Sequence, residues 1–184
     1  KVLDANDAPE GVSCLVIGDR IIGELMSADK SIPLISATGS TRMGKAVGAA
    51  VGARLGRSLL ELGGNNAIII SPDADLDMAL IGAVFGAVGT AGQRCTTTRR
   101  LIIHESVYDT FKENLVKAYK QLRIGNPLDP NNHVGPLIDK DAVSNYLSAI
   151  QKCKAEGGKF IVEGEVLQGN GYLQKRNLKI GIAG

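Results

Sequence analysis

The chain has 184 residues, of which 44% are hydrophobic and 22% charged, a composition typical of one globular domain or of parts of two. Its formal net charge of +2 and its 4% aromatic content, with no tryptophan, argue against nucleic acid, a membrane surface or a base-stacking platform. The three widely spaced cysteines, Cys14, Cys95 and Cys153, form no C-x-x-C pair, so we expect neither a disulfide framework nor a metal site.

The sequence contains no targeting or membrane signal. No apolar run approaches membrane-spanning length, and no signal-peptide pattern follows Lys1. Unpaired cysteines fit a reducing compartment, so we expect a cytoplasmic location, with the mitochondrion as the alternative. Because the chain begins with Lys1 rather than methionine, we expect it to be an internal fragment whose targeting segment, if one existed, has been lost.

The first third of the chain alternates short apolar runs with helical patterns. Strands are predicted where a run is short, apolar and bounded by glycine or proline, at residues 12–17, 32–38 and 57–63. Helices are predicted at residues 21–29 and 41–55. We expect a domain boundary near residues 57–63, where one strand–helix unit ends and a Gly–Gly turn follows.

The rest of the chain continues this alternation. Strands are predicted at residues 66–71, 99–105 and 159–164, and helices at residues 75–89, 106–122 and 139–158. Ser106 is the expected cap of the second of these helices, and the Gly157–Gly158 pair is expected to close the third. Residues 123–137, rich in glycine and proline, are predicted to form a loop. Alternating strands and helices indicate an α/β fold with a largely parallel sheet.

The stretch "SATGSTRMGKAVG", residues 36–48, lies between a predicted strand and a predicted helix. Gly39 permits a tight turn, Ser40 and Thr41 add hydroxyl groups, and the helix start offers free backbone N–H groups, so the stretch predicts an anion site. It resembles a P-loop, but Ala46 stands where a P-loop has the hydroxyl that binds magnesium.

Glycine then recurs every fourth residue, which places a stripe without side chains along one helix face. Such a stripe permits close packing against a sheet, another helix or a flat cofactor, and the sequence leaves these alternatives open. The stripe consists of Gly44, Gly48, Gly52 and Gly56.

Two further residues suggest covalent chemistry. Cys95 follows a glycine-rich turn in "GTAGQRCTTTRR" and stands near three arginines, a setting that favours the reactive thiolate. Glu61 is a carboxylate in an apolar strand before a Gly–Gly turn, and a desolvated carboxylate can act as a base. Taken singly, each has a simpler interpretation: a buried small hydrophobe for the cysteine and a solvated strand end for the glutamate.

Three motifs together resemble the NAD(P)-dependent aldehyde dehydrogenases. L-E-L-G-G matches Leu60 to Gly64, G-Q-x-C matches Gly92 to Cys95, and Glu61 and Cys95 are 34 residues apart (95 − 61), as in the family. G-S-T-x-x-G matches Gly39 to Gly44, and the loop at residues 125–137 also resembles a family loop. Within the family, the Glu and Cys motifs are most similar to the antiquitin group, which oxidises α-aminoadipic semialdehyde in lysine catabolism.

This resemblance implies an aldehyde dehydrogenase-like α/β fold. Residues 1–60 would be the C-terminal half of a parallel-sheet, Rossmann-type NAD-binding domain, and residues 61–184 the N-terminal part of an α/β catalytic domain. The resemblance extends to about Tyr172, and residues 174–184 depart from the family pattern. The full-length form would be a homotetramer.

The resemblance also implies site residues. Cys95 would be the nucleophile, Glu61 the base, and Thr96 a substrate contact. The cofactor would be NAD, with NADP not excluded, and the turn would meet its pyrophosphate without magnesium. The implied cofactor residues are Gly39, Ser40, Thr41, Arg42, Met43, Gly44 and Leu62.

Two other functions fit the same residues. The chain could be a truncated, non-catalytic piece of such an enzyme, or a cysteine esterase that uses the thiolate and the carboxylate without a cofactor. Cofactor dependence separates the esterase from the dehydrogenase, and independent folding tests the truncated piece.

Overall fold

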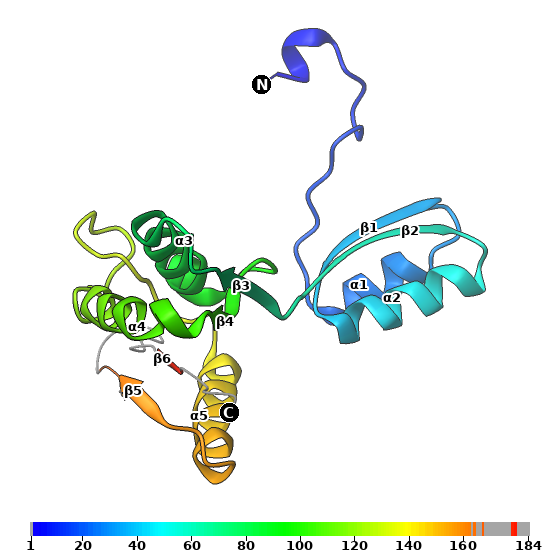
Figure 1. The fold of residues 1–184 in the computed structure, drawn as a ribbon. Helices are drawn as coiled ribbons and strands as arrows, with labels where there is room; N and C mark the ends of the chain where they lie inside the picture. The colour runs from blue at the N-terminus through cyan, green and yellow to red at the C-terminus, as the bar shows by residue number, and fades with distance from the viewer. Residues whose placement is uncertain (1, 163, 165–166, 168–177, 180–184) are drawn as a thin grey trace. The chain divides into compact units, whose positions relative to one another are not determined.

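The computed structural model describes residues 2–162, 164, 167 and 178–179. The chain divides into two compact units, Lys1–Leu62 and Gly63–Gly184, and each is described by itself (Figure 1). The division falls inside the Glu–Leu–Gly–Gly motif, one residue after Glu61.

The first unit is a two-stranded parallel sheet with helices. Strand β1 pairs in parallel with β2 from Leu34 opposite Arg57 to Gly39 opposite Leu62. A right-handed crossover through a helix is the usual connection between such strands, and α2 provides the helix here. In chain order the elements are η1 (Asp4–Asn6), α1 (Arg20–Ala28), β1 (Leu34–Gly39), α2 (Thr41–Ala53) and β2 (Arg57–Leu62).

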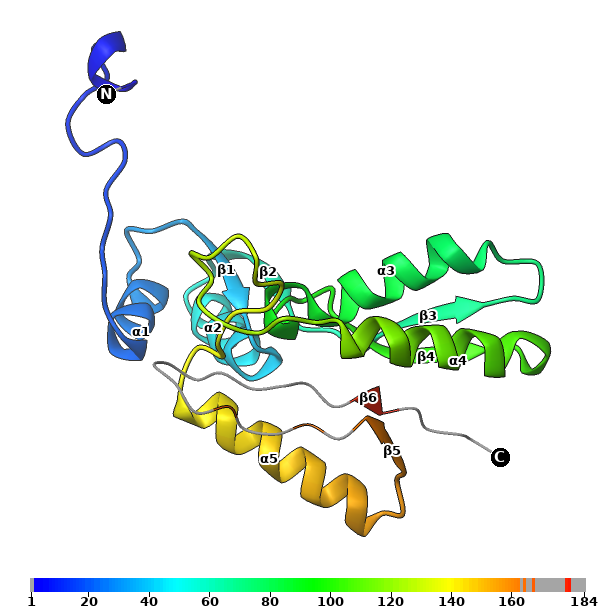
Figure 2. The same ribbon diagram turned by 90° about the vertical axis from the view of Figure 1, so that its left-hand side faces the viewer.

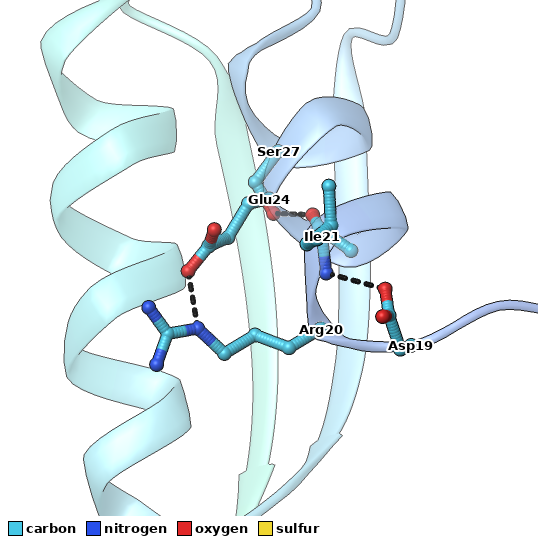
Figure 3. A network of polar contacts seen from close by, with 6 residues as sticks. Asp19, Arg20, Ile21, Glu24 and Ser27 are labelled. Carbon is cyan, nitrogen blue, oxygen red and sulfur yellow. Dashed lines mark hydrogen bonds and ion pairs between the residues drawn. The ribbon is translucent and has the colours of Figure 1, made fainter.

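Helix α1 is stabilised by local polar contacts (Figure 3). Asp19 is its N-cap and accepts a hydrogen bond from the Ile21 N–H at 2.9 Å. Arg20 and Glu24, one turn apart on the exposed side, form an ion pair at 2.6 Å. The Ser27 hydroxyl donates back to the carbonyl of the preceding turn at 2.7 Å.

Packing in the first unit explains half of the glycine stripe. A Cβ on Gly44 would lie 2.5 Å from a methyl of Leu62, and one on Gly48 would lie 3.6 Å from Leu60. The two glycines therefore let α2 approach β2 closely. At Gly52, farther along α2, a Cβ would meet nothing within 4 Å, and Gly56 lies beyond the helix.

The second unit contains a parallel pair and an antiparallel pair of strands. Strand β3 pairs in parallel with β4, and β5 pairs antiparallel with β6 (Figure 2). In chain order the elements are β3 (Asn66–Ile70), α3 (Leu76–Val88), η2 (Gly89–Gly92), β4 (Thr98–Ile103), α4 (Glu105–Lys120), α5 (Lys140–Ala155), β5 (Phe160–Val162) and β6 (Leu178–Lys179).

The core of the second unit lies between the β3–β4 sheet and the helices α3 and α4. Alternate strand residues face it: Ile70 is buried, whereas its neighbour Ile69 is 76% exposed. Phe111 and Leu115, one helical turn apart on α4, are almost completely buried in the same cluster. One face of this sheet is thus covered, and the other carries exposed isoleucines.

Most of the predicted elements are confirmed, and both pairs that dominate the two units are parallel, as expected for an α/β fold. The strand predicted at residues 12–17 is wrong: this segment forms neither helix nor strand and pairs with no strand of the described residues. Leu15 and Ile17 are more than 80% exposed there. A strand needs hydrogen bonds to a neighbour, and an apolar run alone does not supply one.

The predicted cap of α4 is also wrong. His104, not Ser106, is the N-cap, and its Nδ1 accepts from the Ser106 N–H. The Ser106 hydroxyl lies 2.9 Å from the same ring nitrogen, so Ser106 contacts the N-cap residue but is not the N-cap itself. At the other end of the chain, the prediction that residues 174–184 are atypical falls largely outside the described residues, of which only Leu178 and Lys179 remain, in β6.

Candidate active site

The glycine turn joins β1 to α2 at the carboxyl end of the strand. Ser40 is the N-cap, and its Oγ accepts from the Met43 N–H at 3.1 Å. The N–H groups of Thr41 and Arg42, in the first turn, have no acceptor within the helix. The turn therefore presents free donors and the positive end of a helix dipole, an arrangement that suits a phosphate group.

Gly39 serves this turn through its small size. Among the described residues, the glycines with a positive φ are Gly11, Gly92 and Gly157, so the turn conformation expected for Gly39 is wrong. A Cβ at Gly39 would instead lie 2.5 Å from the terminal methyl of Met43. Glycine thus leaves room for the Met43 side chain beside the turn.

Glu61 lies beside the same turn. In the parallel register it is opposite Thr38, and Leu62 is opposite Gly39, so the carboxyl ends of both strands meet at one edge. Leu60 and Leu62 pack toward α2, and side chains alternate along a strand, so Glu61 points to the face opposite α2. Glu61 is exposed there, and the first unit does not supply the desolvation that the sequence suggested.

Cys95 lies in the second unit, on the loop between η2 and β4. Its side chain is exposed and its thiol is free. The backbone before it takes a left-handed turn at Thr90, Ala91 and Gly92, with φ of 53°, 52° and 69°. Non-glycine residues adopt this conformation only at a cost of about 1–2 kcal/mol each, so strained backbone lies at Thr90 and Ala91, at the start of the loop that carries the candidate nucleophile.

The Cys95 loop and the Gly63–Asn66 turn hold each other through side chain-to-backbone hydrogen bonds. Asn66 Nδ2 donates to the carbonyl of Cys95 at 2.6 Å and to that of Thr97 at 3.1 Å. In the opposite direction, Arg99 donates to the carbonyl of Gly64 and Arg100 to that of Asn65. A register shift in the β3–β4 pair between Asn66 and Ala67 lies at the same place.

Arg94 and Gln93 fasten the loop to its other neighbours. The Arg94 guanidinium donates to the Phe85 carbonyl at 3.0 Å and lies over the Phe85 ring, at 4.7 Å from its centroid. The Gln93 carboxamide donates to the Pro136 carbonyl at 3.4 Å and accepts from the Ile138 N–H at 3.0 Å. The loop therefore has fixed links to α3 and to the segment before α5.

These contacts add a structural role to the one expected for the arginines. Arg94, Arg99 and Arg100 were expected to stabilise a thiolate by their charge. Each guanidinium also donates to a backbone carbonyl of a neighbouring segment.

The predicted site residues fall into two groups. Gly39 to Gly44, Leu62 and Glu61 lie together at one sheet edge of the first unit. Cys95 and Thr96 lie in the second, where Thr96 is exposed beside the thiol. Sequence reasoning missed Asn66, Gln93 and the buried Thr97, whose hydroxyl accepts from the Arg94 N–H at 3.1 Å. The one available signal was a polar side chain at the start of the apolar strand 66–71.

Neither a metal cluster nor a membrane helix is found in the described part of the chain. No three His, Cys, Asp or Glu side chains come together there. No helix among the same residues is both long and apolar enough to cross a membrane.

Comparison with known proteins shows which family this chain resembles. Residues 1–177 match the aldehyde dehydrogenase family. The chain is 48% identical over 182 residues to the alpha-aminoadipic semialdehyde dehydrogenase of Bos taurus, covering 99% of this chain and 34% of that protein.

Two solved structures share the fold. Succinate-semialdehyde dehydrogenase from Burkholderia pseudomallei is 33% identical with a TM-score of 0.88, covering 97% of this chain and 37% of that one. A double mutant of betaine aldehyde dehydrogenase from Staphylococcus aureus, solved in complex with NAD+, is 31% identical with a TM-score of 0.82, covering 88% and 32%. The aldehyde dehydrogenase-like α/β fold is thereby confirmed.

The chain spans about a third of the length of the curated relative it matches, since 34% of the Bos taurus protein is covered. The match nevertheless takes in nearly all of this chain and includes the turn, the Glu motif and the Cys motif. The chain therefore belongs to the aldehyde dehydrogenase family.

Proposed function

We propose that this chain is a segment of an enzyme that oxidises an aldehyde to the carboxylic acid with NAD+, with Cys95 as the nucleophile. The observation that carries the proposal is the Cys95 loop: an exposed, free thiol on a backbone that is fastened from three sides. A nucleophile must be accessible and yet held in one geometry, and this loop meets both requirements.

The residues of the glycine turn fit the cofactor's pyrophosphate. Gly39 leaves space at the mouth of the turn, and the amides of Thr41 and Arg42 are free to donate to phosphate oxygens. Ser40 and Met43 shape the first turn of the helix through the cap. Gly44 and Leu62 act indirectly, because their close contact seats the helix on β2. NAD+, with NADP+ as the alternative, would supply the hydride acceptor of the reaction.

Cys95 would act by addition to the aldehyde. The thiolate sulfur forms a bond to the carbonyl carbon, and the carbonyl electron pair moves to the oxygen. The Cys95 N–H would donate to that oxygen, since it donates to no acceptor within the described part of the chain. Loss of hydride from this adduct leaves a thioester on Cys95.

Glu61 would act in the second half of the reaction. Its carboxylate takes a proton from water, and the resulting hydroxide attacks the thioester carbon. The C–S bond then breaks, which releases the carboxylic acid and regenerates the Cys95 thiolate. Its exposure on the face opposite α2 makes it accessible to water. Glu61 and Cys95 belong to different units, each of which is described by itself. Whether the two residues act in one reaction is therefore a question for kinetic measurements.

The proposed substrate is α-aminoadipic semialdehyde, an intermediate of lysine catabolism. The support is the identity to the Bos taurus protein, which is a dehydrogenase of this aldehyde by name. Thr96, exposed beside Cys95, is the proposed substrate contact. We further propose a homotetramer in the cytoplasm, with the mitochondrion as the alternative compartment.

One assay separates this function from the two alternatives. The full-length protein is incubated with α-aminoadipic semialdehyde and NAD+ or NADP+, and formation of the reduced cofactor is followed by its absorbance. Aldehyde-dependent reduction supports the dehydrogenase. Ester hydrolysis without any cofactor reduction would favour the cysteine esterase, and the absence of both would favour a non-catalytic piece.

A further inference from the structure

The contact between Asn66 and the Cys95 loop has a specific geometric consequence. Asn66, half-buried at the start of β3, donates to the carbonyls of Cys95 and Thr97. The carbonyl of Arg94 accepts from the Thr97 N–H at 3.2 Å. The carbonyls on both sides of the Cys95 Cα atom, those of Arg94 and Cys95, are therefore each held by a donor.

Holding a carbonyl also orients an N–H group. In a trans peptide the C=O and the N–H point in opposite directions, and no cis peptide occurs in the described residues. The N–H groups of Cys95 and Thr96 thus point away from the partners that hold these carbonyls. Neither N–H donates to any acceptor in the described part of the chain, and both residues are exposed.

We propose that Asn66 is a positioning residue for the nucleophile. Its carboxamide fixes the Cys95–Thr96 peptide so that the free Thr96 N–H, next to the Cys95 N–H that Thr97 orients, faces the oxygen of a carbonyl substrate. Asn66 itself contacts neither substrate nor thiol in this arrangement and acts through the backbone. The inference rests on the proposed function, because it takes Cys95 as the nucleophile.

Gly64, two residues before Asn66, contributes to the same arrangement. A Cβ on Gly64 would lie 2.8 Å from Asn66 Oδ1, so a side chain there would displace the carboxamide. Asn65, between them, is exposed and its side chain makes no hydrogen bond among those of the described residues. Asn65 therefore provides a matched control: the same side chain, one position away, without the contact.

The test uses two reactions of the Cys95 thiol that differ in one respect. Acylation by p-nitrophenyl acetate passes through an oxyanion that needs N–H donors, whereas alkylation by iodoacetamide displaces iodide and forms no oxyanion. Both rates are measured in the full-length protein, alkylation by mass spectrometry of the Cys95 peptide. The variants are Asn66→Ala, Asn66→Asp, which keeps the shape but removes the donor, and the control Asn65→Ala.

We expect acylation to slow by at least about tenfold in both Asn66 variants, because misdirected N–H donors stabilise the oxyanion less. Alkylation should change by less than about threefold, because the thiol stays exposed. The Asn65→Ala control should leave both rates unchanged. The quantity that tests the assignment is therefore the ratio of the acylation rate to the alkylation rate.

Three results would overturn the assignment of Asn66. The first is that both rates stay as in the active parent, and the second is that both rates fall by the same factor. The third is that both Asn66 variants lose their fold by circular dichroism, which would leave Asn66 a structural role only. A parent enzyme that neither oxidises aldehyde nor forms an acyl-enzyme would instead overturn the proposed function, and with it the nucleophile that Asn66 positions.

Discussion

At the scale of single residues, the polar side chains around Cys95 donate hydrogen bonds to backbone carbonyls. Arg94, Arg99 and Asn66 each donate to a main-chain oxygen of another segment. Such bonds hold a loop in one conformation, because each restricts the backbone and gives a hydrogen-bond partner to a carbonyl outside the sheet. Cys95 keeps an exposed side chain with a free thiol, which suits chemistry rather than packing.

Cys95 should be the only cysteine that the reaction requires. In the full-length protein, Cys95→Ser should abolish aldehyde oxidation, because a serine hydroxyl without a paired base is a far weaker nucleophile than a thiolate. Cys14→Ser, exposed, and Cys153→Ser, buried in α5, serve as controls and should keep activity. Steady-state NADH formation checks the prediction, and full activity in Cys95→Ser would remove this cysteine from the mechanism.

Glu61 should act mainly after the first turnover of cofactor. Glu61→Gln keeps size and hydrogen bonding but cannot take a proton from water, so deacylation should slow by about 10²–10⁴-fold while acylation continues. Stopped-flow measurement should show an NADH burst close to that of the parent, followed by a much slower steady rate. A variant whose burst and steady rate both equal those of the parent would show that another group is the base.

At the scale of elements, the glycine turn depends on how closely α2 lies on β2. Gly44, in the first turn of α2, touches the Leu62 methyls, and this contact sets the position of the amides that we assign to the pyrophosphate. In the proposed site, the distance between helix and strand would therefore affect anion binding. Gly44 and Leu62 would act on the cofactor through packing, whereas Thr41 and Arg42 would act through their N–H groups.

Gly44→Ala should therefore destabilise the protein even though alanine is the better helix former. A Cβ at Gly44 overlaps Leu62, and overpacking of this kind costs about 1–3 kcal/mol, more than the gain of about 1 kcal/mol in helix propensity. Gly52→Ala, in open space on the same helix, should stabilise by up to about 1 kcal/mol. Urea unfolding gives both changes.

The opposite signs of the two substitutions are the point of the experiment. Calorimetric titration of NAD+ should also show weaker binding for Gly44→Ala and unchanged binding for Gly52→Ala, because only the first moves the start of α2. Equal stability changes at the two positions would mean that the contact between Gly44 and Leu62 carries no packing constraint.

At the scale of the whole molecule, each unit has a sheet face that its own helices leave uncovered. Leu34 and Leu59 are about half exposed on the sheet of the first unit, at 51% and 53%, and Ile69 and Ile102 are exposed on that of the second. Each of these sheets has two strands within the described residues. Two-stranded sheets with apolar outer faces are marginally stable alone and promote association.

Residues 1–184 expressed alone should therefore not be a working dehydrogenase. The chain spans about a third of the Bos taurus relative, so cofactor and substrate contacts from the remainder would be missing. Loss of two or three hydrogen bonds of about 1 kcal/mol each should weaken NAD+ binding by at least tenfold to a hundredfold. Light scattering, calorimetric titration and aldehyde-dependent NADH formation check this.

We expect a product that associates and shows no measurable turnover. The full-length protein under the same conditions is the control. A monodisperse product of residues 1–184 with micromolar NAD+ affinity and robust aldehyde oxidation would show that the functional unit ends within this chain.

The sequence by itself determined the alternation of strands and helices, the parallel pairing and the family. Hydrophobic periodicity and glycine or aspartate at element ends are local signals, so α1, α2, α3 and α5 lie close to their predicted ranges. The motifs around Gly39, Glu61 and Cys95 are also local, and they were sufficient to recognise the family.

Only the tertiary structure decided which side chains contact one another. Residues 12–17 are as apolar as a strand but pair with none of the described strands, and pairing is a long-range property. The sequence places three arginines near Cys95, but it does not show that each donates to a backbone carbonyl of a neighbouring segment. Asn66 is 29 residues from Cys95 in the chain, and its role follows from a contact that exists only because β3 lies beside β4.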